Sequence, residues 1–311
     1  MRILMVGAGA TGGYLGGRLL QHGRDVTFLV HEKRAQQLAQ HGLVICSAMG
    51  NVDVPRPTTV LASELRAPFD LIVLSCKAYG LEQAMADIAP AVGPHSTILP
   101  LLNGMRQLDL LDERFGAARV FGGQCAISAM LDAQGVVQHL NRMHGFTFGE
   151  RDGSNTPRMQ EITRTFADAG FDSRPSGTVV QEMWDKWVFL ASLAGITCLL
   201  RGSIGEIVAA SGGCDATLAL LDECHAVAAA SGYALTERVM QRARTMLTEA
   251  GSAMAASMLR DLQHGYPIEA DHVIGDMLAR ADRQQGRVVM LPLVYAHLKV
   301  YEAARLASKP A

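Results

Sequence analysis

The sequence RILMVGAGATGGYLGGRLLQHGRDVTFLV, residues 2–30, determines the fold of the first part of this chain. Apolar runs at 2–6 and 25–30 flank a glycine-rich turn and a stretch long enough for a helix. This order of strand, glycine turn, helix and strand turns a bare GxGxxG into a specific signal for a dinucleotide-binding unit.

The three glycines of the turn have separate expected roles. Gly7 allows the tight turn, Gly9 lets the backbone approach a pyrophosphate, and Gly12 lets the helix pack closely on the strand. The unpaired amides at the start of the helix then face the phosphates. The predicted cofactor loop consists of Gly7, Ala8, Gly9, Ala10, Thr11 and Gly12. A glycine-rich turn without a ligand is the alternative interpretation.

Composition limits the classes to which the chain can belong. Its 311 residues exceed one typical core and predict two domains. Apolar residues make up 49% and charged residues 19%, and no apolar run reaches the ~18 residues of a membrane span. A net charge of −2 argues against nucleic acid as a partner. We see no signal peptide and expect a cytoplasmic protein that is not bound to a membrane.

Cysteines and histidines give no sign of a metal site. The six cysteines lack a CxxC pair, which favours reduced thiols in a cytoplasmic protein. His139 and His144 are spaced i, i+5 without nearby acidic or cysteine partners, so we expect them to be surface residues.

Secondary-structure signals divide the chain into an α/β part and a helical part. Strands are expected at 69–75, 96–102 and from 120, a hairpin at 136–140 and 145–149, and a helix at 156–169 with strand signals to 175. The later segments have helical spacing and end at glycines. Helices are expected at 179–200, 215–231, 236–249, 252–264, 268–285 and 292–307. The predicted fold is an N-terminal Rossmann doubly wound sheet (1–177) followed by an all-helical domain (178–311).

Lysine is scarce, with five residues in the chain, and two lysines follow informative segments. Lys77 follows a buried strand directly, and Asn103 follows the next strand, so both belong at the carboxyl edge of the sheet, where ligands bind. Lys186 lies in Trp184-Asp185-Lys186-Trp187, where partial desolvation favours general acid catalysis. A surface lysine with a turn asparagine, and a lysine extending from a buried helix, are the ordinary alternatives.

These motifs resemble those of ketopantoate reductases (2-dehydropantoate 2-reductases), nearly from end to end. The segments that carry the resemblance are GAGATG at 7–12, CKAY at 76–79, LNGM at 102–105, WDKW at 184–187, and ASMLRD at 256–261 with GYPIEAD at 265–271. The last segment is the most specific, since a serine twelve residues before a glutamate in that setting marks the family.

The resemblance implies that NADPH delivers hydride to the keto carbon of a 2-oxo acid, most simply 2-dehydropantoate in pantothenate biosynthesis. Lys186 would protonate the carbonyl oxygen and Glu269 would hold the substrate hydroxyl. Ser257 would bind the substrate carboxylate. Asn103 and Lys77 would position cofactor and substrate, and Glu269 would also contact the cofactor. A homodimer is a possible assembly.

The chain departs from the family pattern at three positions. Leu190, Ala194 and Met254 stand where the family usually has asparagine. Each lost amide contact costs ~0.5–1.5 kcal/mol, so a bulkier or more apolar 2-oxo acid is an alternative substrate. Groups further along the same helix, such as Thr197, could compensate. A non-catalytic NADP(H)-binding regulator and a relative of the β-hydroxyacid dehydrogenases are the other hypotheses, and neither explains the segment from Ser257 to Glu269.

The residues after the second strand predict which dinucleotide binds. His31, Lys33 and Arg34 form a basic cluster that suits the 2′-phosphate of NADP(H). Glu32 weakens this signal, and a solvated charge patch is the alternative.

Overall fold

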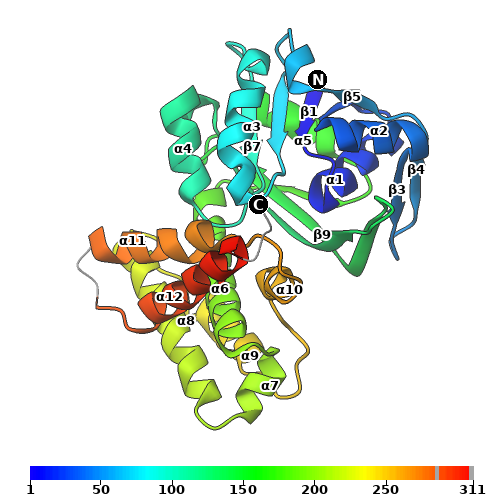
Figure 1. Ribbon diagram of the computed structural model, residues 1–311. Helices are drawn as coiled ribbons and strands as arrows, with labels where there is room; N and C mark the ends of the chain where they lie inside the picture. The colour runs from blue at the N-terminus through cyan, green and yellow to red at the C-terminus, as the bar shows by residue number, and fades with distance from the viewer. Residues whose placement is uncertain (284–286, 308–311) are drawn as a thin grey trace. The chain divides into compact units, whose positions relative to one another are not determined.

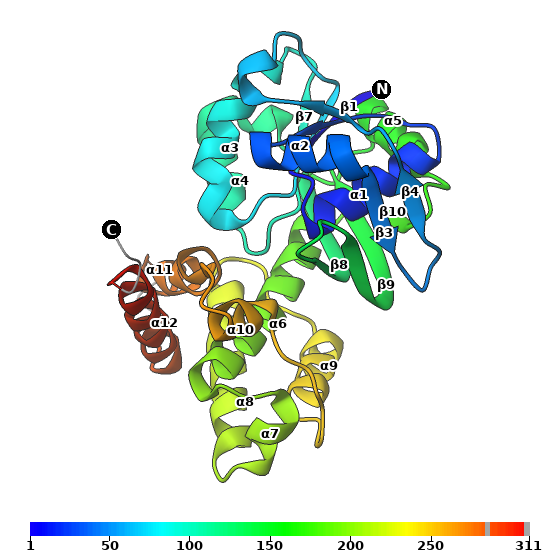
Figure 2. The ribbon, with the colours of Figure 1, turned by 45° about the vertical axis from the view of Figure 1, so that its right-hand side comes forward.

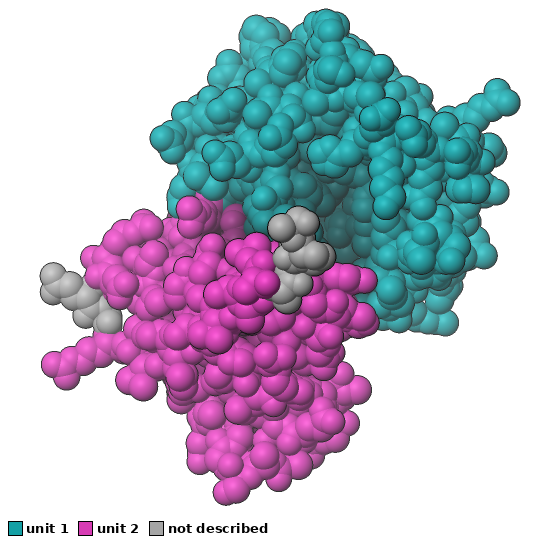
Figure 3. Space-filling view, viewed as in Figure 1, with its two compact units in different colours: residues 1–102, 107–180 teal, residues 103–106, 181–311 magenta. Residues whose placement is uncertain are grey.

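The computed structural model describes residues 1–283 and 287–307. These form two compact units (Figures 1 and 3). The first contains Met1–Leu102 and Gln107–Val180, and the second contains Asn103–Arg106 and the chain from Gln181 onward.

The first unit is built on a parallel sheet in the order β5-β2-β1-β6-β7. Its strands are β1 (Arg2–Val6), β2 (Asp25–Leu29), β5 (Thr58–Val60), β6 (Leu71–Leu74) and β7 (Thr97–Pro100). Every residue of β6 and β7 is buried, as expected for strands covered on both faces. The chain reverses its direction of travel across the sheet between β1 and β6, where doubly wound sheets bind ligands.

A second sheet in the same unit has the order β10-β9-β3-β4, with β8 paired to β9. Its strands are β3 (Leu43–Cys46), β4 (Val52–Val54), β8 (Gly122–Leu131), β9 (Val137–Gly149) and β10 (Asp172–Pro175). The predicted hairpin at 136–140 and 145–149 is wrong, because both segments belong to the single strand β9, whose antiparallel partner is β8. Residues 140–143 have no paired partner in β8, so the register of the two strands shifts there. At this shift the ring of His139 forms a hydrogen bond with the carbonyl of Met143 at 2.9 Å.

Helix α1 (Ala10–Gln21) lies against both sheets, as Figures 1 and 2 show. Glycines make this close packing possible. A methyl group on Gly16 would lie 2.5 Å from the ring of Phe28 in the parallel sheet. On Gly13 and Gly17 it would lie 2.9 Å from Val137 and 2.7 Å from Ile45 in the second sheet.

The remaining helices of the first unit cover the sheets. They are α2 (Glu32–His41), α3 (Leu81–Ile88), α4 (Arg106–Phe115) and α5 (Pro157–Phe166). Short 3₁₀ turns connect them: η1 (Ala62–Glu64), η2 (Ala78–Gly80), η3 (Ala89–Ala91) and η4 (Ala117–Arg119).

The second unit is helical. It contains α6 (Val179–Leu200), α7 (Ile204–Ala209), α8 (Gly213–Ala230), α9 (Glu237–Leu247), α10 (Ser257–Gln263), α11 (Asp276–Arg283) and α12 (Met290–Ala307). A π-helical turn, η5 (Asp271–Gly275), precedes α11. Helix α6 packs on α8 and α12 at Gly195, where a methyl group would meet Leu220 at 2.8 Å and Val294 at 3.3 Å.

Two helices differ from the sequence expectation. The helix expected at 252–264 begins only at Ser257, because the carbonyls of Ser252 and Met254 accept hydrogen bonds from the first amides of α7 at 2.8 and 2.9 Å. The helix expected at 268–285 is a π-turn followed by α11, and its expected end at Gln285 lies outside the described residues.

Helix α6 is long and apolar enough to span a membrane by length and composition, with a mean hydropathy of 1.3. In the described structure, 67% of that apolar window is buried inside the protein. A helix in the core of a water-soluble protein passes the same test, so this observation is weak evidence for a membrane span.

Substituting Gly12→Ala should lower the free energy of unfolding by about 1–3 kcal/mol, the typical cost of overpacking. The new methyl group would collide with the carbonyl oxygen of Gly7 and the side chain of Ser75. Urea denaturation followed by circular dichroism measures the loss. Gly9→Ala is the matched control, since a methyl group there has no neighbour within 4 Å. Equal losses in the two variants would contradict this account of the packing.

Candidate functional site

The glycine loop after β1 has the geometry of an anion-binding turn. Gly7 has a φ of +94°, and its amide donates to the carbonyl of Leu29 at 2.9 Å. The hydroxyl of Ser75, just past β6, donates to the carbonyls of Val6 and Gly7 at 2.8 and 3.2 Å. Gly9 caps α1 without a side-chain hydrogen bond, and open space surrounds its α-carbon. The first amides of α1 therefore border a place where a phosphate can approach the backbone.

Three residues after β2 supply positive charge to the same edge of the sheet. His31 and Lys33 are exposed, and His31 caps α2. Arg34 is half-buried, and its Nε donates to the carbonyl of Ala8 at 3.0 Å while its Nη1 donates to that of Gly135 at 3.1 Å. Its Nη2 is buried and has no hydrogen-bond partner among the described residues, so the two N–H groups of this nitrogen are unsatisfied.

Lys77 lies at the carboxyl end of β6, next to β1 in the sheet. It is exposed and precedes the 3₁₀ turn η2. Its position after β6 places it at the same sheet edge as the glycine loop.

In the helical unit, Lys186 of α6 donates from Nζ to Oδ1 of Asn103 at 3.1 Å. Lys186 is half-buried, and the neighbouring Trp184 and Trp187 are 2% and 1% exposed. The pair therefore presents a held cation beside a carboxamide.

The aromatic side chains beside Lys186 are held on several sides. The indole of Trp184 stacks on Tyr233 with ring centroids 5.5 Å apart. The guanidinium of Arg280 lies 5.6 and 5.7 Å from the rings of Trp184 and Trp187, and Arg280 pairs with the buried Asp276 at 3.0 Å. These contacts restrict the rotation of α6 around Lys186.

Glu269 is connected to the same helix through the π-turn. The indole of Trp187 donates to the carbonyl of Val273 at 3.0 Å, and the amide of Val273 donates to the carbonyl of Glu269 at 3.0 Å. Glu269 is half-buried, whereas Ser257 is exposed at the first residue of α10. The contacts thus join Lys186, Asn103 and the Glu269 segment, while Ser257 stands on a separate element.

The π-turn is anchored to α12 by a polar cluster. Asp271 accepts hydrogen bonds from Tyr295 at 2.7 Å and from Lys299 at 2.9 Å. Partial burial opposes the ionised carboxylate, but these bonds and the charge of Lys299 outweigh it, so the pKa of Asp271 is lowered. Lys299 therefore has a structural role in holding this turn.

The positions that depart from the family pattern have different environments. Leu190 is half-buried and lies one helical turn beyond Lys186, whereas Ala194 is 2% exposed. Thr197 is fully buried and donates to the carbonyl of Leu193 at 2.6 Å. The expectation that Thr197 compensates for a lost amide is therefore wrong, because its hydroxyl proton is already used within the helix.

Comparison with known families decides the class of the chain. Residues 3–153 match the family "Ketopantoate reductase PanE/ApbA", and residues 178–302 match "Ketopantoate reductase PanE/ApbA C terminal". The chain belongs to the ketopantoate reductase family. It is accordingly an oxidoreductase that acts on CH–OH groups.

Individual relatives of this family member cover nearly its whole length. "Uncharacterized oxidoreductase YkpB" of Bacillus subtilis is 37% identical over 98% of this chain and 100% of its own. The structure of 2-dehydropantoate 2-reductase from Geobacter metallireducens is 27% identical, with a TM-score of 0.88 over 96% of this chain and 99% of its own. A D-mandelate dehydrogenase with NADH and anilino(oxo)acetate, 21% identical over 98% and 99% of the two chains, shares the fold with a TM-score of 0.87.

One expectation about histidines is wrong. His139 and His144 are 8% and 7% exposed, not surface residues. His139 forms a hydrogen bond with Ser47 and His144 forms one with Tyr14, each at 2.8 Å, so both buried rings have hydrogen-bond partners. Among the described residues the six cysteines form no disulfide, and Cys198 and Cys224 are buried.

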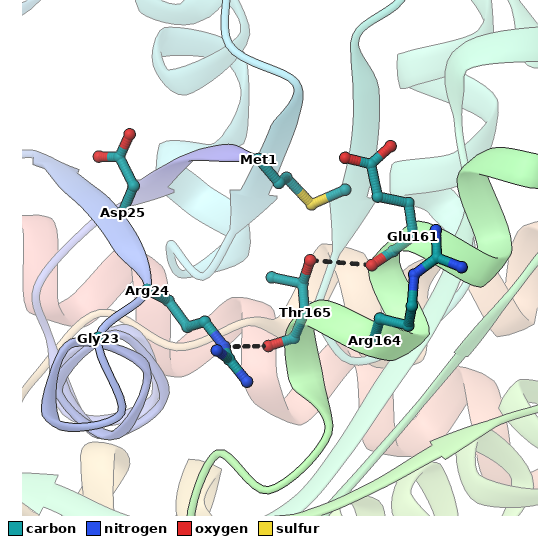
Figure 4. Close-up of a pocket in the computed structure, with 7 residues that line it drawn as sticks. All are labelled: Met1, Gly23, Arg24, Asp25, Glu161, Arg164 and Thr165. Atoms are coloured by element: carbon teal, nitrogen blue, oxygen red, sulfur yellow. Dashed lines mark hydrogen bonds between the residues drawn. The ribbon is translucent and has the colours of Figure 1, made fainter.

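A separate pocket of about 340 Å³ lies in the first unit, away from the glycine loop (Figure 4). Its lining comes from the start of β1 and β2 and from α5: Met1, Gly23, Arg24, Asp25, Glu161, Arg164 and Thr165. Arg24 donates to the carbonyl of Thr165 at 2.8 Å across it. Since ligands of doubly wound sheets bind at the carboxyl ends of strands, this pocket at the amino ends is not the dinucleotide site.

Sequence reasoning missed His272, which lies three residues after Glu269 in the π-turn and is 6% exposed. Burial is the main cause that lowers its pKa to about 4, opposed by Asp276 and assisted by Arg106. In a single sequence, a histidine that follows a site residue is weak evidence for a functional role, because histidines in protein cores are common.

The pKa of His272 predicts a pH dependence of stability. The unfolded chain binds a proton near pH 6.5 and the folded chain only near about 4, so acidification favours unfolding. The free energy of unfolding should fall between these values by roughly 3 kcal/mol through this residue. Urea denaturation should show that the free energy of unfolding drops less between pH 7.5 and pH 4.5 in His272→Asn than in the wild-type protein. The exposed His95→Asn is the control, and an equal drop in all three proteins would contradict the prediction.

Proposed function

We propose that this protein uses NADPH to reduce a 2-oxo acid to a 2-hydroxy acid. The observation that carries the proposal is the bond from Lys186 Nζ to Asn103 Oδ1 at 3.1 Å, with both tryptophans beside Lys186 buried. A half-buried ammonium held in this way suits protonation of a carbonyl oxygen. Residues 1–177 would bind the cofactor and residues 178–311 would bind and protonate the substrate.

Residues of the first unit suit the phosphate groups of NADP(H). The glycine loop and the uncapped start of α1 suit the pyrophosphate. The unpartnered Arg34 Nη2, with His31 and Lys33 beside it, suits the 2′-phosphate. The backbone segment Gly7–Gly12 and the side chain of Lys77 would thus hold the cofactor.

NADPH supplies hydride to the keto carbon when it is bound. As negative charge develops on the carbonyl oxygen, Lys186 neutralises that charge and donates the proton. Such positioned acid catalysis is worth ~10²–10⁴-fold. Glu269 accepts a hydrogen bond from the substrate hydroxyl, and Ser257 donates one to the substrate carboxylate. Asn103 orients the Lys186 ammonium through its carboxamide oxygen.

The substrate that the family name favours is 2-dehydropantoate, which gives pantoate for pantothenate biosynthesis. Leu190, half-buried one turn beyond Lys186, favours a bulkier or more apolar 2-oxo acid as the second candidate. A regulator without activity has less support, because it would not need the bond between Lys186 and Asn103. We propose that the enzyme is cytoplasmic and that its partner is the small-molecule substrate rather than a membrane or a nucleic acid. A homodimer is its candidate assembly.

Lys186→Ala should lower turnover of the true substrate by at least ~10²-fold, because the proton donor is lost. Its dissociation constant for NADPH should change little, since Lys186 is not among the residues assigned to the cofactor. Steady-state kinetics and isothermal titration measure both quantities. Lys33→Ala is the control and should show the reverse pattern. Near-wild-type turnover by Lys186→Ala would remove this lysine from the reaction.

The substrate can be identified by NADPH oxidation with 2-dehydropantoate and with 2-oxo acids that carry larger aliphatic or aromatic groups. If Leu190 contacts the substrate, the larger acids should have the higher kcat/KM, and Leu190→Asn should shift the preference toward 2-dehydropantoate. Ala194→Asn is expected to destabilise the fold instead, because it buries an amide. A wild-type kcat/KM above ~10⁴ M⁻¹s⁻¹ for 2-dehydropantoate would show that Leu190 is harmless there.

NADPH should bind more tightly than NADH, because Lys33 and Arg34 supply positive charge for the 2′-phosphate and His31 lies beside them. Isothermal titration of both cofactors measures the two dissociation constants. Equal affinities for NADPH and NADH would mean that these residues do not bind the 2′-phosphate.

A further inference from the structure

The segment that carries Asn103 is held by the π-turn of the same unit. The buried ring of His272 forms a hydrogen bond with the backbone of Asn103. A methyl group on the next residue, Gly104, would lie 3.0 Å from the carbonyl oxygen of His272 and 3.3 Å from its ring. It would also lie 3.6 Å from the indole nitrogen of Trp187. Asn103 and Gly104 are therefore packed against His272 and the helix that carries Lys186.

The conformation of Gly104 explains why the segment that carries Asn103 must be held by another part of the unit. Its φ of +88° interrupts any regular structure between β7 and α4, so no helix or strand hydrogen bonds orient Asn103. The side chain of Asn103 nevertheless meets Lys186 at a defined distance of 3.1 Å. The hydrogen bond from the His272 ring supplies the orientation that local structure does not.

The surroundings of His272 suit a fixed, neutral ring. Asp276 and Arg106 act on it with opposite signs, and Asp276 is already paired with Arg280 at 3.0 Å. Burial keeps the imidazole uncharged near neutral pH. A neutral imidazole has one donor and one acceptor, so it can hold a backbone group without placing a second cation beside the Lys186 ammonium.

We propose that His272 is a positioning residue for the proton-donating lysine: it holds the backbone of Asn103 so that the carboxamide oxygen meets Lys186 Nζ. This inference rests on the proposed function of Lys186. His272 acts through Asn103 and does not itself touch the substrate.

The kinetic test compares His272→Phe, which keeps an aromatic ring without its hydrogen bond, with His272→Asn and His272→Gln, which keep a donor. His272→Phe should lower kcat at least ~10-fold while KM and the dissociation constant for NADPH stay within ~2-fold. One of the two amide variants should recover most of the loss. Ile274→Val, a conservative change in the same buried turn, is the matched control and should leave kcat unchanged.

A double-mutant cycle separates positioning from a general structural effect. In an Asn103→Ala background, His272→Phe should cause almost no further loss of kcat, because its target is gone. The same ~10-fold loss in both backgrounds would overturn the proposal, and so would wild-type kcat in His272→Phe. Thermal unfolding of each variant shows whether it is folded.

An NMR measurement keeps the test independent of the substrate. The chain has five lysines, so the ¹⁵Nζ resonance of Lys186 can be assigned with Lys186→Arg. Proton exchange of this ammonium with water should become at least ~3-fold faster in His272→Phe and in Asn103→Ala, but not in Ile274→Val. An unchanged exchange rate in His272→Phe would overturn the positioning role of His272. Failure of the protein to reduce any 2-oxo acid would instead count against the proposed function, and the exchange measurement would still test His272.

Discussion

The close approach of α1 to two sheets is the constraint on which the first unit depends. Gly12 and Gly16 bring the helix onto the parallel sheet, and Gly13 and Gly17 bring it onto the second sheet. The contacts of Gly13 with Val137 and of Gly17 with Ile45 connect the second sheet to the start of the helix. These glycines therefore shape the end of the glycine turn and the core behind it, since side chains in either place would force the layers apart.

Much of this architecture follows from local patterns in the sequence. The strand–turn–helix order at residues 2–30, the buried strands β6 and β7, and α6 from Val179 to Leu200 are strong local signals. The errors occur where long-range contacts decide the structure. Residues 136–149 look like a hairpin, but β8 offers a partner along the whole of β9. Residues 252–256 have helical composition, but α7 uses their carbonyls as its cap.

The candidate site shows the same division between local and long-range information. The glycine loop, Lys186 and Asn103 could be named from sequence because each follows a recognisable element or motif. Their contact could not be predicted from the sequence, since Asn103 and Lys186 are 83 residues apart and meet through a hydrogen bond between their side chains. His272, Arg280 and Tyr233 could not be chosen from one sequence, because their importance comes from what they touch: the Asn103 backbone and the two tryptophans of α6.

The short segment Asn103–Arg106 is part of the helical unit although the chain reaches it directly from β7. This interleaving has a consequence for recombination. A chimera joined between Val180 and Gln181 would inherit Lys186 and His272 from one parent and Asn103 from the other. The lysine and the amide to which it is hydrogen-bonded would then come from different parents, so a chimera that keeps one parent's helical unit intact needs a second crossover around this four-residue segment.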